Sequence, residues 1–172
     1  MENKKFSLRP LALKDVDRML EWMHDDDVTQ YLRLDGKSAT KESVSKFIAD
    51  AQHIDQNCHC AIVDENDLYY GTVSLKNIDK AAGEAEYAIA LHSSAIGQRV
   101  AGIATELILE CAFAQLGLRR VYLNVLDENK RAIKFYEKFG FNYIKNEAMD
   151  FGGAAKYLRW YDICNNAFPT PT

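Results

Sequence analysis

The chain has 172 residues, of which 48% are hydrophobic and 27% are charged, and its net charge is −4. That length fits one domain with a substantial core, and the composition excludes an intrinsically disordered chain. The negative charge argues against broad binding to nucleic acid or to an anionic membrane. No run approaches the roughly 18 apolar residues of a membrane span. The start of the chain contains no apolar secretion segment, so we expect a cytoplasmic protein.

The first third of the chain predicts one strand followed by two helices. Residues 6–11 form the expected strand. Apolar residues then recur twice at the i, i+3, i+4, i+7 spacing of a helix face, and Thr40 can cap the second helix. The first stripe is Val16, Met19, Leu20 and Met23, and the second is Val44, Phe47, Ile48 and Ala51. An acidic segment at 25–27 reads as a polar loop between the helices.

The rest of the chain predicts a series of strands interrupted by two helices. The expected strands cover 60–63, 69–75, 84–91, 120–125, 141–144 and 156–163, and the expected helices cover 102–116 and 129–139. Gly117 and Gly140 are natural helix stops. The passage from 84 to 125 has the strand-loop-helix-strand order of a parallel crossover.

The resulting order is β-α-α-β-β-β-α-β-α-β-β, a mixed α+β pattern rather than a strict βαβ alternation. We predict one domain over residues 1–164. Residues 165–172 form the expected flexible tail.

The segment before the long helix is a candidate phosphate-binding loop. A helix start presents free backbone N–H groups and a partial positive charge, which suit phosphate oxygens. Gly102 would let the ligand approach the backbone, and Arg99 could add a charged hydrogen bond. The alternative is a plain loop with a glycine at a helix start. The segment is neither a Walker loop nor a dinucleotide fingerprint.

Several segments together resemble the GNAT N-acetyltransferase superfamily. Arg99-x-x-Gly102-x-Ala104 is similar to its acyl-CoA loop, and the run from Tyr122 to Val125 with Asn129 to Phe141 is similar to its second signature. Residues 8–11 and 21–23 look like its ribosomal-protein-alanine and polyamine acetyltransferase branch. The resemblance implies a mostly antiparallel, V-splayed mixed sheet of six to seven strands with about four helices. It also implies acetyl-CoA as the cofactor.

The resemblance carries a set of cofactor contacts onto this chain. Those residues are Ile89, Ala90, Leu91, Arg99, Val100, Ala101, Gly102, Ile103, Ala104, Thr105, Asn124, Asn129 and Ala132. Ile89 to Leu91 would contribute backbone groups. Asn129 is also well placed to cap the following helix. The chain departs from the family at Val100 and Ala101, where many relatives have a glycine and a basic residue. The stretch 86–102 also looks longer than usual.

Acetyl transfer to an amine needs a proton acceptor for the amine and a proton donor for the departing thiolate. The resemblance places Tyr136 at the sulfur as the donor, and the alternative is a tyrosine packed on the core. Strand alternation puts Glu84 and Glu86 on one face. Glu86 matches the acid that some similar enzymes use as the acceptor of the proton. The alternative is a solvated carboxylate at a sheet edge.

The acceptor amine should contact the first helices and their loop, with Trp22, Tyr31 and Glu84 as candidate contacts. The sequence leaves open a polyamine, a protein N-terminus, a nucleotide amino sugar or another small amine. A non-catalytic acyl-CoA sensor with the same fold is the alternative function.

The remaining features of the sequence predict no further chemistry. The four cysteines lack the spacing of a metal site, so we expect no metal. Aromatic residues of the last strands could build a homodimer or complete the core. These residues are Tyr157, Trp160 and Tyr161.

Overall fold

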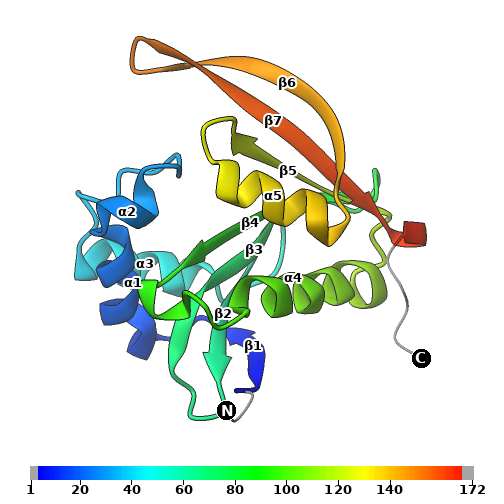
Figure 1. Cartoon of the computed structure of the whole chain (residues 1–172). Helices are drawn as coiled ribbons and strands as arrows, with labels where there is room; N and C mark the ends of the chain where they lie inside the picture. Colours follow the sequence, from blue (N-terminus) through cyan, green and yellow to red (C-terminus); the bar gives the residue numbers. More distant parts are fainter. Residues whose placement is uncertain (1–3, 168–172) are drawn as a thin grey trace.

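The computed structural model describes residues 4–167, which form one seven-stranded sheet with helices on both faces (Figure 1). The strand order is β1-β2-β3-β4-β5-β7-β6. The strands are β1 (Phe6–Pro10), β2 (Cys58–Asp64), β3 (Tyr69–Asp79), β4 (Glu84–Leu91), β5 (Arg120–Leu126), β6 (Asn142–Phe151) and β7 (Ala154–Cys164). All neighbouring strands are antiparallel except β4 and β5, which are parallel. The expected crossover and the mixed α+β class are therefore confirmed.

Three N-terminal helices cover one face of the sheet. They are α1 (Val16–Met23), α2 (Asp26–Thr29) and α3 (Lys41–Asp50). Apolar side chains of α1 and α3 pack on β2 and β3 in a core that includes Met19, Trp22, Ile48 and Tyr69. This apolar contact layer holds α1 and α3 in a fixed position on the sheet.

The short helix α2 was not expected, since its sequence reads as an acidic loop. Asp25 has an extended backbone, and its side chain accepts a hydrogen bond from the Asp27 N–H at 3.0 Å. That contact caps the N-terminus of α2, so the acidic run starts a helical turn where a loop was expected.

Two further helices, α4 (Val100–Glu110) and α5 (Lys130–Phe139), cover the opposite face. In Figure 1 they lie in front of the sheet, whereas α3 lies behind it. The larger core lies between these helices and strands β2 to β5 and β7. Helix α4 continues as a π-helical turn over Cys111–Gln115, so the helical segment ends close to the predicted stop at Gly117.

The hairpin of β6 and β7 extends far beyond the predicted strands. Sequence patterns indicate strands over 141–144 and 156–163, but the structure pairs Asn142 to Phe151 with Ala154 to Asp162. Most β6 side chains are exposed on both faces of the strand. The strand therefore lacks the alternation of buried and exposed residues from which a strand is recognised. In Figure 1 the hairpin reaches across the molecule toward the loop that follows α2.

The end of the chain is described only in part. Asn165–Ala167 form a short 3-10 turn after β7, while residues 168–172 of the predicted tail lie outside the described part.

Candidate active site

The sheet opens between β4 and β5, the parallel pair at its centre. Their pairing joins Glu84 to Arg120, Ala85 to Val121 and Glu86 to Tyr122. Within the described residues, the pairing of these two strands extends no further. Beyond Glu86 the strands separate, so the sheet has a closed end and an open end along the same two strands.

The open end of β4 presents backbone groups toward this gap. The His92 N–H donates to the Tyr70 carbonyl at 2.9 Å, which identifies a hydrogen-bonded pair with β3. An antiparallel ladder bonds every second residue, so Ala90 also faces β3. Ile89 and Leu91 therefore direct their N–H and C=O groups to the side from which β5 has separated. A ligand in the gap could be held by these backbone groups.

The first turn of α4 forms a second group of free donors. Arg99, the residue before the helix, has a left-handed backbone with φ 58° and ψ 16°. A left-handed residue followed by a helical one makes the concave arrangement of N–H groups that binds anions. The first intrahelical bond runs from Ile103 N–H to the Arg99 carbonyl. The N–H groups of Val100, Ala101 and Gly102 precede it and point out of the helix.

The surface at this helix start has room for a phosphate group. A Cβ atom added at Gly102 would meet no other heavy atom within 4 Å. By contrast, the side chains of Val100, Ala104 and Thr105 are buried in the core below. A ligand here would meet the backbone and the open face of Gly102, which fits the expected binding of a pyrophosphate.

Glu86 lies at the last paired position of β4, where the gap begins. One carboxylate oxygen accepts from Asn124 Nδ2 at 3.2 Å, and the other accepts from Asn77 Nδ2 at 3.0 Å. Lys76 Nζ is 3.6 Å from the first oxygen. The side chain is only 14% exposed. These donors hold the carboxylate in one orientation at the open end, which disfavours the freely solvated alternative.

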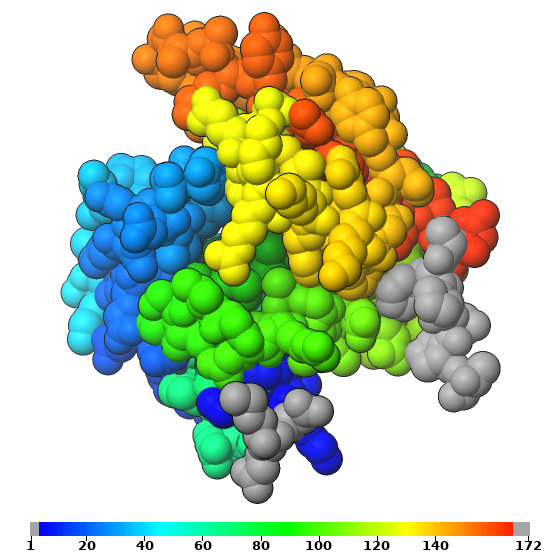
Figure 2. Space-filling view, viewed as in Figure 1, coloured from blue at the N-terminus to red at the C-terminus, as the bar shows by residue number. Residues whose placement is uncertain are grey.

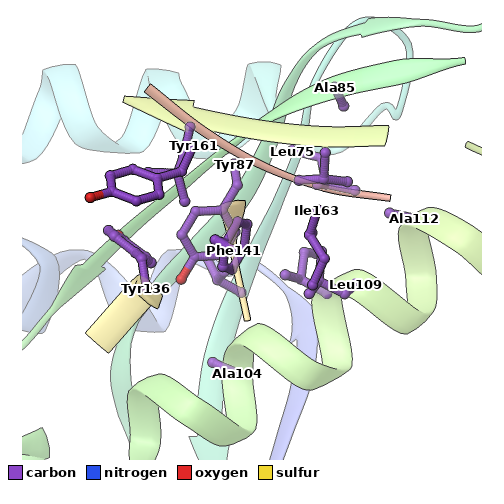
Figure 3. Close-up of a cluster of buried hydrophobic side chains, with 14 of the residues drawn as sticks. Leu75, Ala85, Tyr87, Ala104, Leu109, Ala112, Tyr136, Phe141, Tyr161 and Ile163 are labelled. Carbon is purple, nitrogen blue, oxygen red and sulfur yellow. The ribbon is translucent and has the colours of Figure 1, made fainter. Parts of the chain in front are cut away.

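Tyr136 approaches the gap from the opposite face of the sheet. Its side chain is 8% exposed and packs edge-to-face on Tyr87, with ring centroids 5.9 Å apart. Figure 3 shows the two rings beside Ala104 of α4. The Tyr87 hydroxyl pairs with Thr105 Oγ1 at 2.9 Å. Burial raises the pKa of the Tyr136 phenol above its ordinary value, so the protonated form is retained.

Glu86 and Tyr136 thus flank the gap from opposite faces of the sheet. In β4, Glu86 is half-buried on one face, and the adjacent Tyr87 is buried on the face that carries Tyr136. A carboxylate and a protonated phenol on two sides of one opening can respectively accept and donate a proton.

Other predicted site residues lie elsewhere or have structural partners. Glu84 accepts from Arg120 at 3.0 Å at the closed end of the strand pair. Trp22 is buried, and its indole N–H donates to the Tyr69 hydroxyl at 2.9 Å. Asn129 caps α5 by accepting from the Ala132 N–H at 3.2 Å. Tyr31 is half-buried in the turn after α2.

One further residue, which the sequence does not indicate, reaches the gap. Arg33 Nη2 donates to Asn124 Oδ1 at 2.7 Å, across 91 positions of the chain. Arg33 and Met149 line a pocket of about 390 Å³ between the loop after α2 and the β6–β7 hairpin. A single arginine in a polar loop gives no signal of such a contact, because the partner depends on the fold.

The described residues contain neither a membrane-spanning helix nor a metal site. Among the helices of residues 4–167, none combines the length and apolarity that a membrane span needs. Within the same range, no three His, Cys, Asp or Glu side chains are arranged to hold a metal ion. All four cysteines are free thiols.

Comparison with known proteins gives consistent matches. The model of the acetyltransferase (GNAT) domain family matches residues 5–142. An uncharacterised N-acetyltransferase, p20, of Bacillus licheniformis is 27% identical over 80% of this chain and 79% of its own length. The spermidine N(1)-acetyltransferase of Escherichia coli K12 is 28% identical over 83% of this chain and 75% of its own length.

A solved structure has the same fold. It is the spermidine N-acetyltransferase of Vibrio cholerae in complex with CoA and spermine, which matches with a TM-score of 0.86. The match covers 95% of this chain and 97% of that one, at 20% sequence identity.

Proposed function

The chain belongs to the GNAT acetyltransferase family, and on that premise we propose that it transfers the acetyl group of acetyl-CoA to a primary amine. The transfer would occur by direct attack of the amine while both reactants are bound. The observation that carries this proposal is the opening between β4 and β5, with Glu86 and Tyr136 on its two sides. The acceptor is a polyamine, a protein N-terminus, a nucleotide amino sugar or another small amine, and the amine panel described below distinguishes these alternatives.

Acetyl-CoA supplies an activated acetyl thioester. The N–H groups at the start of α4 would bind its pyrophosphate, with Gly102 allowing close approach of the backbone. The backbone groups of Ile89 and Leu91 would hold the pantetheine arm and the thioester oxygen in the gap. These contacts use main-chain groups that the sheet leaves unpaired.

Glu86 would accept a proton and Tyr136 would donate one during the transfer. An alkylammonium titrates near ~10, so at neutral pH the acceptor must lose a proton before it can attack. Glu86, which is held by two amides, would take that proton directly or through water. Tyr136 would donate its phenolic proton to the departing sulfur. The phenol is protonated at neutral pH, and burial, which raises the pKa of Tyr136, maintains that protonated form.

The test is release of free thiol from acetyl-CoA over a panel of amines, with the acetylated product identified by mass spectrometry. The panel includes spermidine, the acceptor named for two relatives, together with amino acids, amino sugars and peptide N-termini. We expect thiol release that depends on the amine, with one acetylated product per thiol. Tight CoA binding without turnover of any amine would contradict the proposal and favour a sensor function.

A further inference from the structure

The guanidinium of Arg33 is exposed and forms its hydrogen bonds beside the gap between β4 and β5. Its two hydrogen bonds go to uncharged groups, Asn124 Oδ1 at 2.7 Å and Met149 Sδ at 3.4 Å. Arg9, Arg120 and Arg159 each form an ion pair with an aspartate, whereas Arg33, like Arg18 and Arg119, takes part in no ion pair of residues 4–167. A guanidinium has five N–H donors in a planar fork. Arg33 therefore has both unused donors and uncompensated charge.

This charge is located beside the candidate proton acceptor. Asn124 accepts from Arg33 through its oxygen and donates to Glu86 through its nitrogen. One carboxamide group thus separates the guanidinium from the carboxylate. In the space-filling view, the blue segment that contains α2 abuts the yellow start of α5 below the orange hairpin tip (Figure 2).

The acidic side chains around Arg33 have other partners. Asp35 and Asp150 line the same pocket, but each accepts from a backbone N–H of its own turn, Ser38 at 3.3 Å and Gly153 at 2.7 Å. Asp25 caps α2, as described above. Asp26 pairs with Lys37 at 3.5 Å, so two residues of the acidic segment at 25–27 are engaged in local structure. Arg33 is the cation that lines this pocket, beside the carboxylates of Asp35 and Asp150.

The loop that carries Arg33 is held in place at its other end. A Cβ atom at Gly36 would lie only 2.0 Å from the Met23 carbonyl oxygen, so this position allows close approach of the loop to the end of α1. His24 Nε2 also contacts the Ala39 carbonyl at 2.9 Å. Anchoring reduces the entropy lost when a ligand binds to Arg33.

We propose that the acceptor amine carries an oxyanion, a carboxylate or a phosphate, a few bonds from its nitrogen, and that Arg33 binds this group. The inference rests on the proposed function and narrows its acceptor. Carboxylate and phosphate oxygens match the guanidinium fork and would replace Asn124 and Met149 as its partners. The amine would then lie at Glu86, which the side-chain carboxamide of Asn124 separates from Arg33. A purely cationic acceptor such as spermidine would instead place its charge against the guanidinium.

The experiment uses pairs of amines that differ only in the oxyanion. One pair is an α-amino acid and its amide, and the other is 2-aminoethyl phosphate and ethanolamine, with spermidine measured alongside. We expect the wild-type kcat/KM to favour the oxyanion member of at least one pair by about 10-fold or more. The pair with the larger ratio distinguishes carboxylate from phosphate as the recognised group.

Two variants and a control assign that preference to Arg33. Arg33→Gln should reduce the ratio to near one through KM, and Arg33→Lys should give an intermediate ratio because it keeps the charge without the fork. Lys37→Gln removes a cation from the same loop that pairs with Asp26 at 3.5 Å, and it should leave the ratio unchanged. Thermal melting of each variant separates these effects from loss of folding.

Calorimetric titration of the same amines into the CoA-bound protein keeps the two proposals distinguishable. Arg33-dependent binding of an oxyanion amine without turnover would support this inference while the proposed function fails. Turnover with spermidine preferred over every oxyanion amine would overturn the inference and leave the function standing. An unchanged ratio in Arg33→Gln, or no binding and no turnover of any oxyanion amine, would also overturn it.

Discussion

Glu84 and Glu86 lie two residues apart on the same face of β4 and have opposite surroundings. Glu84 is paired with Arg120, which also binds Asp162 at 2.8 Å, at the end where β4 and β5 are joined. Glu86 is held by two neutral amides where the strands separate. The first carboxylate is compensated by a cation and belongs to the scaffold. The second is held by two amides, with the Lys76 ammonium 3.6 Å from one of its oxygens, at the point where the strands separate.

The backbone shows the same contrast. Ala85 and Ile89 point their main-chain groups to the same side of β4, but only Ala85 has β5 opposite. One strand therefore provides a rigid support at one end and unpaired hydrogen-bonding groups at the other. If the chemistry is confined to the open end, substitutions there should impair catalysis and substitutions at the closed end should not.

The largest effect is expected at Tyr136. Tyr136→Phe should lower kcat by about 10²- to 10⁴-fold with little change in KM for acetyl-CoA, because the ring still packs while the donated proton is lost. Steady-state thiol release measures both constants. Tyr161→Phe is the matched control, since Tyr161 is a fully buried tyrosine of the same core whose hydroxyl donates to Glu137 at 2.8 Å. A Tyr136→Phe enzyme with wild-type kcat would exclude it as the proton donor.

Glu86→Gln should lower kcat/KM by on the order of 10- to 100-fold at neutral pH, because the amide cannot accept the proton of the amine. The loss should shrink toward pH ~10, where more acceptor is already neutral. Rates across a pH series test this expectation. Glu84→Gln should leave kcat/KM within about twofold and reduce stability by at most about 1 kcal/mol, as expected for a partly exposed ion pair. Equal losses in both variants would remove the distinction between the two ends.

Gly102→Leu should raise KM for acetyl-CoA by about 10-fold, because a branched side chain would occupy the open space at the helix start. The same substitution should not destabilise the fold, since the added Cβ would meet no heavy atom beyond its own stretch of helix within 4 Å. Gly102→Ala is the control and should raise stability by about 0.5–1 kcal/mol through helix propensity. Thermal melts and acetyl-CoA titrations separate the two effects. An unchanged KM in Gly102→Leu would show that the pyrophosphate binds elsewhere.

The smallest effect concerns pH. Burial raises the pKa of Tyr136, so its proton stays bound through the whole range below the ordinary phenol value of about 10. The kcat profile should therefore show no alkaline decline below pH ~10 that depends on Tyr136. The raised pKa of Tyr136 is also linked to the stability of the fold. Its contribution to the free energy of unfolding is fully present below the pKa of the phenol in the unfolded state. The contribution is lost only as the pH rises above that value. A Tyr136-dependent decline near pH 8 would contradict this assignment.

The sequence predicts the elements whose physical causes are local. Thr40 and Asn129 cap their helices as expected, and the glycines at 117 and 140 adopt positive φ near the helix ends. The strand at 84–91 has the predicted bounds because its alternation is read directly from its residues. Helix α2 was missed because an acidic run reads as a loop until Asp25 is known to cap it.

The site is only partly accessible from the sequence. Glu86 and Tyr136 could be proposed from a family resemblance, but their position on opposite faces of one gap follows from the divergence of two strands. The Arg33 contact depends on a hairpin whose exposed strand has no alternating pattern. Trp22, a candidate acceptor contact in the sequence, lies in the core, and its burial depends on packing that a single aromatic residue does not reveal.

Residue-resolved amide hydrogen exchange, measured by NMR with and without CoA, tests the central claim most directly. In the free protein, the amides of Ile89 and Leu91 should exchange faster than that of Ala85, because only Ala85 is paired with β5. Addition of CoA should protect Ile89, Leu91 and the first turn of α4 while leaving Ala85 unchanged. Equal protection of Ile89 and Ala85 in the free protein, or no response of Ile89 and Leu91 to CoA, would contradict the assignment of the open end as the cofactor site.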